Sequence, residues 1–237
     1  IVRAVAPKKT DNIIEIGPGL GALTQQLLPQ LSCLSVIELD KDLIPLLEEK
    51  CRHLGKLIVY QGDALKFNFK SLSKANGLWR LVGNLPYNIS TPLLFHCLDQ
   101  ASAIQDMHFM LQKEVVDRLN AQPGQASYGR LSVMIQYYCG VEKLFNVKPG
   151  AFQPPPKVDS AVVRLIPYKE LPYKANDPLL FAEIVRIAFS QRRKMLRNNL
   201  ANLLQAEDFE QLNIDPRQRP EQLFVSDYVN LANFLTK

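Results

Sequence analysis

Short apolar runs alternate with segments of helical periodicity through the first two thirds of this chain. Five of the runs predict strands: residues 12–17, 34–39, 56–61, 78–83 and 107–112. The segments between them repeat apolar residues at helical spacing, as in GALTQQLLPQL at 21–31. Parallel strands need helical crossovers of this kind, so the alternation predicts an α/β fold with a mostly parallel sheet covered by helices on both faces.

Two more apolar runs close this region. Residues 141–147 and 160–167 flank a proline-rich turn, which predicts two strands joined as a terminal antiparallel hairpin. From Pro178 onward only helical periodicity is present, in four segments: residues 177–189, 192–204, 206–214 and 226–235. These segments are too short for a robust core of their own. We therefore expect a larger domain at residues 1–172 and a small helical domain at residues 173–237.

The composition of the 237 residues excludes several classes of protein. No apolar run approaches the length of a membrane-spanning helix, and the opening IVRAVAPKK lacks the apolar core and cleavage site of a signal peptide. The chain starts without Met, so we expect that an N-terminal piece is missing.

None of the cysteines or histidines has metal-ligand spacing. The cysteines lack a C-x-x-C pair: Cys33, Cys51, Cys97 and Cys139. The histidines are scattered among apolar or amphipathic runs: His53, His96 and His108. We interpret both sets as structural, which predicts no metal site, no disulfide framework and reduced thiols in a cytoplasmic protein.

Basic residues gather in one stretch of the C-terminal region. The net charge is +5, and residues 186–200 carry five cations and no acid: Arg186, Arg192, Arg193, Lys194 and Arg197. A solvated helix face would explain this charge, and so would a polyanionic partner. We predict that the last four of these cations contact phosphate groups.

The motif EIGPGLG at 15–21 follows the first predicted strand and opens the first helix. Gly17 and Gly19 allow a tight turn and a close approach of backbone to a ligand. Glu38 ends the second strand and Asp63 follows the third, on the edge where open parallel sheets bind ligands. Taken singly, each acid could be a solvated loop residue or a helix cap. Together they predict a nucleoside crevice, with Glu38 accepting from ribose hydroxyls and Asp63 from an adenine amine.

The spacing E-x-G-x-G-x-G indicates which nucleoside binds. Dinucleotide folds usually carry G-x-G-x-x-G, with a pyrophosphate on the helix N-terminus. The form found here is typical of enzymes that use S-adenosylmethionine, which has no phosphate. Together with the terminal hairpin, it favours a Rossmann-like class I methyltransferase. A nicotinamide-dependent dehydrogenase is the alternative, although the sequence offers no catalytic His or Tyr–Lys pair.

The stretch NLPYNIS at 84–90 follows the fourth predicted strand, beside this crevice. An adenine amine is a poor nucleophile because its lone pair is delocalised into the ring. The side-chain oxygen of Asn84 and the carbonyl of Leu85, held extended by Pro86, can accept its two hydrogens and aim the lone pair at a methyl group. Tyr87 offers a face on which the base can stack. The alternative is a proline-containing loop with a packed tyrosine.

The segment AFQPPPKVDS at 151–160 could supply a second stacking face. Phe152 precedes a rigid proline run, and a base taken out of an RNA helix needs two such faces. Phe152 could instead be a hydrophobic anchor of its loop. Lys157 could contact phosphate or only solvent.

These motifs together resemble the KsgA (RsmA) type of small-subunit ribosomal RNA adenine dimethyltransferases. The likeness runs from about residue 12 to 237 and includes EIGPGLG, VIELD, GDAL, GNLPYNIS, FMLQKEVVDRL, YGRLSVMIQYY, AFQPPPKVDSAVVRL and QRRKMLRNNL. NLPY is shared with related antibiotic-resistance methyltransferases of large-subunit rRNA, but the unbroken AFQPPPKVDSAVVRL and FMLQKEVV favour the KsgA branch.

The resemblance implies that two adjacent adenines near the 3′ end of 16S rRNA are each dimethylated late in 30S subunit assembly. It assigns catalysis to the larger domain and rRNA binding to the helical one, and we expect a monomer. The implied contacts to S-adenosylmethionine are Gly17, Glu38, Asp63 and Asn84; Tyr87 and Phe152 would hold the target base. The family's G-Q-N-F-L segment, which helps cover the cofactor, has no counterpart here. A non-catalytic RNA-binding assembly or transcription factor on the same scaffold is the remaining alternative.

Overall fold

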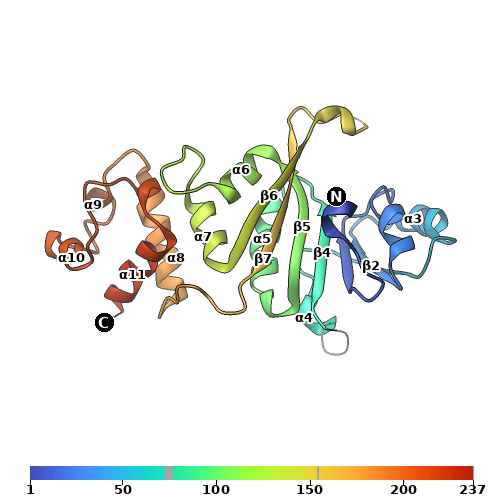
Figure 1. Ribbon diagram of the computed structural model, residues 1–237, viewed down its shortest axis with the longest axis horizontal. Helices are drawn as coiled ribbons and strands as arrows, with labels where there is room; N and C mark the ends of the chain where they lie inside the picture. The colour runs from blue at the N-terminus through green and yellow to red at the C-terminus, as the bar shows by residue number, and fades with distance from the viewer. Residues whose placement is uncertain (73–76, 154, 237) are drawn as a thin grey trace. The chain divides into compact units, whose positions relative to one another are not determined.

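Seven strands form one sheet in the computed structural model, which describes residues 1–72, 77–153 and 155–236 (Figure 1). The strands are β1 (Ile13–Ile16), β2 (Leu34–Glu38), β3 (Leu57–Gln61), β4 (Trp79–Asn84), β5 (Ile104–Gln112), β6 (Cys139–Val147) and β7 (Ser160–Pro167). β3, β2, β1, β4 and β5 run parallel in that order, and β7 pairs antiparallel with β5. The seven predicted strands and the mostly parallel sheet are confirmed.

The strand order β3-β2-β1-β4-β5-β7-β6 changes direction between β1 and β4. From β1 the chain winds outward through β2 to β3, and then it adds β4 and β5 on the other side of β1. In an open parallel sheet, ligands bind at the carboxyl ends of the strands beside such a switch point. The topology therefore indicates where in the fold to look for a site.

The chain divides into two compact units. Unit 1 contains Ile1–Val116 and Gly140–Pro167, and unit 2 contains Asp117–Cys139 and Tyr168–Lys237. Residues 117–139, predicted as part of the larger domain, group here with the C-terminal helices. The functional division at residue 172 stays a prediction.

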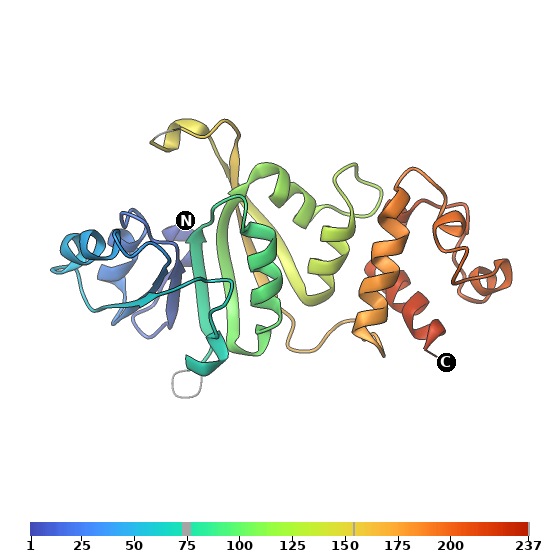
Figure 2. The ribbon, with the colours of Figure 1, turned by 180° about the vertical axis from the view of Figure 1, so that it is seen from behind.

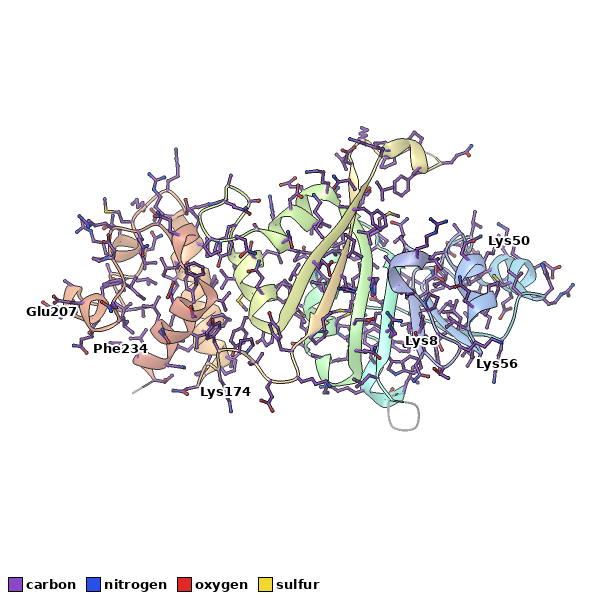
Figure 3. All side chains as sticks on the ribbon, in the orientation of Figure 1. Lys8, Lys50, Lys56, Lys174, Glu207 and Phe234 are labelled. Carbon is purple, nitrogen blue, oxygen red and sulfur yellow. The ribbon has the colours of Figure 1, made fainter. Side chains whose placement is uncertain are left out.

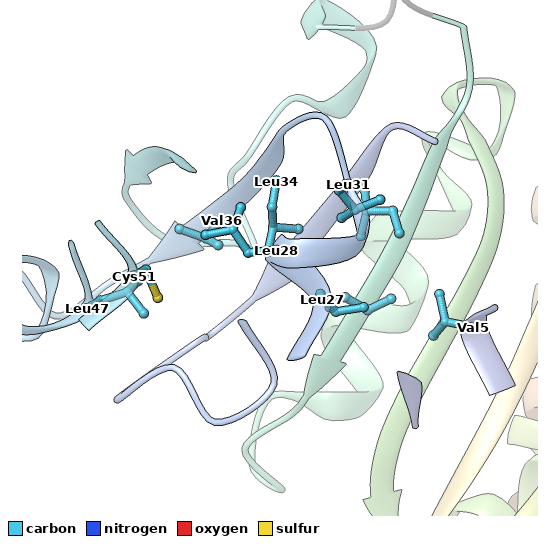
Figure 4. Packing of buried hydrophobic residues seen from close by; sticks show 10 residues of the cluster. Val5, Leu27, Leu28, Leu31, Leu34, Val36, Leu47 and Cys51 are labelled. Atoms are coloured by element: carbon cyan, nitrogen blue, oxygen red, sulfur yellow. The ribbon is translucent and has the colours of Figure 1, made fainter. Parts of the chain in front are cut away.

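Short helices of unit 1 pack on the sheet. They are α1 (Val2–Val5), α2 (Thr24–Leu27), α3 (Ile44–Cys51), α4 (Phe69–Leu72) and α5 (Ser90–Leu98), with the 3-10 turns η1 (Leu28–Gln30), η2 (Ala101–Ala103) and η3 (Pro149–Ala151). α6 (Lys113–Asn120) continues from unit 1 into unit 2. Leu27 and Leu28 of the predicted helical segment 21–31 are buried, and with Leu47 of α3 they join Leu34 and Val36 of β2 in one apolar cluster (Figure 4).

Unit 2 is helical, as predicted for the C-terminal region (Figure 2). Its helices are α7 (Arg130–Tyr138), α8 (Pro178–Ala188), α9 (Leu196–Asn199), α10 (Ala206–Gln211) and α11 (Val225–Leu235), with the 3-10 turns η4 (Phe189–Gln191) and η5 (Pro220–Gln222). Aromatic rings form its core, for example Tyr137 and Phe181 with centroids 4.3 Å apart. No helix among the residues that the structure describes has the length and hydropathy to cross a membrane.

The predicted helix at 192–204 is wrong over most of its length. Only α9 is helical there, because the backbone N–H groups of Leu196 and Arg197 donate to the carbonyls of Gln218 (2.7 Å) and Pro216 (3.2 Å). These donors therefore bond to a neighbouring loop instead of to a preceding helical turn. Helical spacing alone did not reveal this competing partner.

A buried arginine joins three segments of unit 1. Arg80 on β4 donates from Nε to Asp106 Oδ1 on β5 (3.0 Å) and from Nη1 to Asp11 Oδ2 (2.7 Å). Its Nη2 donates to the carbonyl of Val5, which lies in α1 (2.8 Å). The network thus ties α1 and the segment before β1 to the middle of the sheet.

Candidate active site

The pairing registers bring the predicted site residues to one edge of the sheet. Glu38 pairs with Gln61, two residues before Asp63, and Asn84 pairs with Met110 on β5. Ile16 pairs with Ile37, so that Gly17 comes beside Glu38, and the N–H of Gly17 continues the ladder to the Ile37 carbonyl (2.9 Å). The carboxyl ends of β1, β2, β3 and β4 therefore present the glycine turn, both acids and NLPY together.

The glycine turn has the conformation that the motif predicted. Gly17 and Gly19 have φ values of +65° and +55°, a region that side chains rarely adopt. A Cβ on either residue would meet no atom within 4 Å, so this backbone faces open space. Lys50 of α3, labelled in Figure 3, places its Nζ 3.5 Å from the carbonyl of Leu20, the next residue of the motif. The turn can accept a ligand against its backbone.

Glu38 is buried and connects the turn to its own strand end. Its Oε2 accepts from the N–H of Gly19 (3.1 Å) and its Oε1 from the N–H of Asp40 (2.9 Å). Each carboxylate oxygen can accept a further hydrogen bond. Asp63, half-buried, accepts the N–H of Leu65 through Oδ1 (2.9 Å), which leaves Oδ2 without a hydrogen bond among the described residues. Both acids keep acceptor capacity for a nucleoside.

Glu15 opens the motif EIGPGLG and was not among the predicted site residues. It lies on β1 with 2% of its surface exposed, and its Oε2 accepts from the Thr24 hydroxyl at the start of α2 (2.7 Å). Burial, reinforced by the charge of Glu38 and opposed by the Thr24 hydrogen bond, raises the pKa of Glu15 from 4.5 to about 7. The signal in the sequence was the acid that opens E-x-G-x-G-x-G, but its burial depends on the packing of α2.

Replacing Glu15 with glutamine is expected to stabilise the protein at high pH. Because the folded pKa is raised, the contribution of Glu15 to stability is fully present below about pH 4.5 and is lost as the pH rises through about 7. Above that window the ionised form costs about 3 kcal/mol. Glu15→Gln should therefore have the higher free energy of unfolding at pH 8 and little advantage at pH 4.5, measured by urea titration. The exposed Glu48→Gln is the control, and a pH-independent difference for Glu15→Gln would contradict the assignment.

The NLPY segment leaves two acceptors free. Leu85 donates its N–H to the carbonyl of Met110 (3.1 Å), which extends the β4–β5 ladder, and its side chain is buried. Its carbonyl and the exposed side chain of Asn84 have no hydrogen-bond partner in the described parts of the chain. Gly83 permits this arrangement, since a Cβ there would lie 2.7 Å from the Ile16 carbonyl. Two unpaired acceptors thus follow one another where β4 ends beside β1.

Tyr87 is held at both ends. Its hydroxyl lies 3.1 Å from Oγ of Ser160, the first residue of β7, and its carbonyl accepts from the hydroxyl of Ser90 (3.0 Å). Ser90 is the first residue of α5, and Ile89, at the N-cap position of this helix, makes no side-chain capping hydrogen bond. The Ser160 contact had no signal in the sequence, because it joins residues that are 73 positions apart.

Phe152 lies in the connection between β6 and β7, directly after η3. Its backbone N–H donates to the Pro149 carbonyl (3.1 Å), and its half-buried ring makes no contact with the Tyr87 ring among the described residues. Pro154 of the predicted proline run lies outside the described residues, and Lys157 is exposed. A pair of stacking faces formed by Tyr87 and Phe152 therefore stays a prediction.

The basic stretch of unit 2 separates into paired and unpaired cations. Arg186 is paired with Glu183 (2.6 Å), and Arg192 donates to the Ala126 carbonyl. Three exposed side chains have no hydrogen-bond or ion-pair partner in the described residues: Arg193, Lys194 and Arg197. No group of acids, histidines and cysteines within residues 1–72, 77–153 and 155–236 could hold a metal ion.

Comparison with known proteins agrees with this geometry. Residues 1–237 match the model of a family described as ribosomal RNA adenine dimethylase. The chain is 56% identical to the ribosomal RNA small subunit methyltransferase A of Marinomonas sp. (strain MWYL1), over 100% of this chain and 89% of that protein. A crystal structure of a dimethyladenosine transferase from Plasmodium falciparum has a TM-score of 0.81 at 28% identity, over 97% of this chain and 91% of that chain.

The crystal structure of the 23S rRNA methyltransferase ErmE has a similar fold. Its TM-score is 0.76 at 22% identity, over 100% of this chain and 96% of that chain. With the dimethyladenosine transferase, it confirms the predicted Rossmann-like methyltransferase fold.

Proposed function

The chain belongs to the ribosomal RNA adenine dimethylase family, as its motifs had suggested, and from this premise we propose that it dimethylates the N6 amines of two adjacent adenosines near the 3′ end of 16S rRNA. We place the reaction on the immature 30S subunit in the cytoplasm and assign it to a monomer. Family membership excludes the dehydrogenase alternative. The observation that carries the proposal is the pair of free acceptors at Asn84 and Leu85, beside the glycine turn.

A methyltransferase of this family uses S-adenosylmethionine as methyl donor, and the residues at the sheet edge fit it. The cofactor supplies a methyl group made electrophilic by a sulfonium. Gly17 and Gly19 give it open backbone, Glu38 offers acceptors for ribose hydroxyls and Asp63 Oδ2 an acceptor for the adenine amine. Asn84 borders this space at the end of β4.

NLPY orients the target amine. The Asn84 amide oxygen and the Leu85 carbonyl accept its two N–H groups, which favours a pyramidal nitrogen whose lone pair points away from the base. Because both acceptors are already in place, little reorganisation accompanies the reaction. Neither of them can take up a proton near neutral pH, so the proton that N6 loses after each transfer goes to solvent. Tyr87 and Phe152 are assigned to stacking on the base.

A methyl-transfer assay tests the proposed function. The protein is incubated with tritiated S-adenosylmethionine and 30S subunits that lack dimethyladenosine, and the digested rRNA is examined by mass spectrometry. We expect dimethyladenosine at the two adjacent positions. Absence of label in 16S rRNA, or label on another base, would reject the proposal.

Loss of the Asp63 carboxylate is expected to weaken binding of S-adenosylmethionine. Asp63→Ala removes the acceptor assigned to the adenine amine, and an unpaired buried donor costs about 1–3 kcal/mol. Isothermal titration calorimetry with the cofactor alone measures this loss. The exposed Asp99→Ala is the control, and unchanged affinity in Asp63→Ala would remove Asp63 from the cofactor site.

The unpaired cations of unit 2 are expected to contact phosphates of the rRNA. Changing Arg193 and Arg197 to alanine should weaken 30S binding and flatten its salt dependence by on the order of one unit per lost contact. Cofactor affinity should not change. Arg186→Ala is the matched control, because Glu183 already neutralises this arginine. An unaltered salt slope in the double variant, or an equal change in Arg186→Ala, would contradict the assignment.

A further inference from the structure

We propose that Ser160 is a positioning residue, which sets the orientation of the Tyr87 ring for methyl transfer. This inference rests on the proposed function, since it assigns a role within the same site. It connects NLPY with the last residue of AFQPPPKVDS, two motifs that lie far apart in the sequence.

The two side chains differ in burial. Tyr87 is 37% exposed, whereas Ser160 is 1% exposed. The hydroxyl of Tyr87 reaches Ser160 Oγ at 3.1 Å, and either oxygen can donate. The tip of the tyrosine is therefore anchored while part of its surface stays accessible. Because Ser160 is almost fully covered and its hydroxyl contacts Tyr87, we assign its effect on the substrate to the orientation of Tyr87.

Ser160 is itself held in place by the sheet. Ser160 pairs with Gln112 of β5 in the antiparallel ladder, and the N–H of Lys113 donates to the Asp159 carbonyl just before it (2.9 Å). The backbone of Tyr87 is fixed as well, because its carbonyl accepts from the Ser90 hydroxyl. Tyr87 is thus held at its ring hydroxyl by the first residue of β7 and at its backbone carbonyl by the first residue of α5.

A separate ion pair at the start of β7 closes the connection that carries Phe152. Asp159, next to Ser160, accepts from Lys148 across the base of this connection (2.8 Å). The start of β7 is therefore where the Phe152 segment and the Tyr87 ring are both attached. A base held by Tyr87 would have its orientation set by β7 as well as by NLPY.

Loss of the contact between Ser160 and Tyr87 should affect the second methylation more than the first. A monomethylated amine has one hydrogen left to donate, so it is oriented by one acceptor contact fewer and depends more on how the base is stacked. A ring that can rotate would allow the first transfer but slow the second. Loss of the Ser160 hydroxyl should therefore raise the ratio of monomethyladenosine to dimethyladenosine.

A double-mutant cycle tests the proposal with wild type, Ser160→Ala, Tyr87→Phe and the double variant. Removing either hydroxyl should lower the rate of dimethylation by about 3- to 10-fold, the effect of one hydrogen bond. The double variant should be no slower than either single one, and monomethyladenosine should accumulate equally in all three. Ser35→Ala, which changes a buried serine of β2, is the matched control and should behave as wild type.

An additive loss in the double variant, or a wild-type product ratio in Ser160→Ala, would overturn the proposal. A measurement on the protein without substrate tests the contact between Ser160 and Tyr87 independently of the proposed function. In protein labelled with ¹³C-tyrosine, the Tyr87 ring resonance, identified by its absence in Tyr87→Phe, should move in Ser160→Ala and not in Ser35→Ala. An unmoved resonance rejects the tether. A moved resonance in a protein that does not methylate rRNA would instead reject the proposed function.

Discussion

Asn84→Ala is expected to lower the rate of methyl transfer by on the order of 100- to 1000-fold, the usual effect of removing one preorganised polar contact to a transition state. The alanine variant keeps the Leu85 carbonyl, so the amine is still held by one acceptor but its lone pair is no longer oriented. Folding should be little affected, because the Asn84 side chain is exposed and makes no hydrogen bond within the described residues.

Single-turnover assays on 30S subunits that lack dimethyladenosine separate this effect from binding. We expect the rate to fall while affinity for the subunit is retained and cofactor affinity declines only modestly. Asn146→Ala, which removes an exposed asparagine of β6, is the control. Dimethyladenosine formed by Asn84→Ala at the wild-type rate would show that this interpretation of NLPY is wrong.

Arg80→Met is expected to cost about 3–5 kcal/mol of unfolding free energy. The methionine fills a similar volume, but it leaves the carboxylates of Asp106 and Asp11 without their counter-charge in a largely buried position. It also removes the donor to the Val5 carbonyl, so that α1 loses its tie to the sheet. Urea titration at pH 7 measures the loss.

The pH dependence of this loss tests its electrostatic cause. Burial tends to raise the pKa of Asp106, but His108, whose Nδ1 lies 3.6 Å away, and Arg80 outweigh it and hold the pKa below the ordinary value of 3.8. A lowered pKa contributes stability above pH 3.8 that is lost as the pH falls through the folded pKa. The difference in unfolding free energy between wild type and Arg80→Met should therefore become smaller at low pH.

Arg52→Met is the matched control, since Arg52 forms an exposed pair with Glu49 on the surface of unit 1. Such pairs contribute less than about 1 kcal/mol. Equal destabilisation by the two substitutions would contradict the role assigned to the buried network. A loss of unfolding free energy in Arg80→Met that does not change with pH would also contradict it.

Local patterns were sufficient for the architecture of the sheet. Each strand contains a run of apolar residues that the sequence pattern detected, and the glycines of EIGPGLG adopt the positive φ that few other residues tolerate. The position of Glu38 at a strand end follows from the length of its apolar run. The sequence therefore predicted which residues gather at the carboxyl edge of the sheet, because parallel strands align their ends there.

Local patterns failed where a distant partner decided the structure. The predicted helix at 192–204 is interrupted because backbone donors of Leu196 and Arg197 bond to the loop at 216–218. Arg192 resembles Arg193, Lys194 and Arg197 in sequence. In the structure, however, its guanidinium donates to the Ala126 carbonyl. Helical spacing and charge cannot report such contacts, since both describe only nearby residues.

The sequence by itself determined the α/β class, the glycine turn and the presence of Asn84 and Leu85 at the end of a strand. Only the tertiary structure decided that Tyr87 is anchored by Ser160, that Glu15 is buried beneath Thr24, and that Arg80 joins α1 to the sheet. The physical reason is the distance along the chain. Ser160 reaches Tyr87 because β7 enters the sheet antiparallel beside β5 in one register, and a shift of one residue would turn its hydroxyl to the other face.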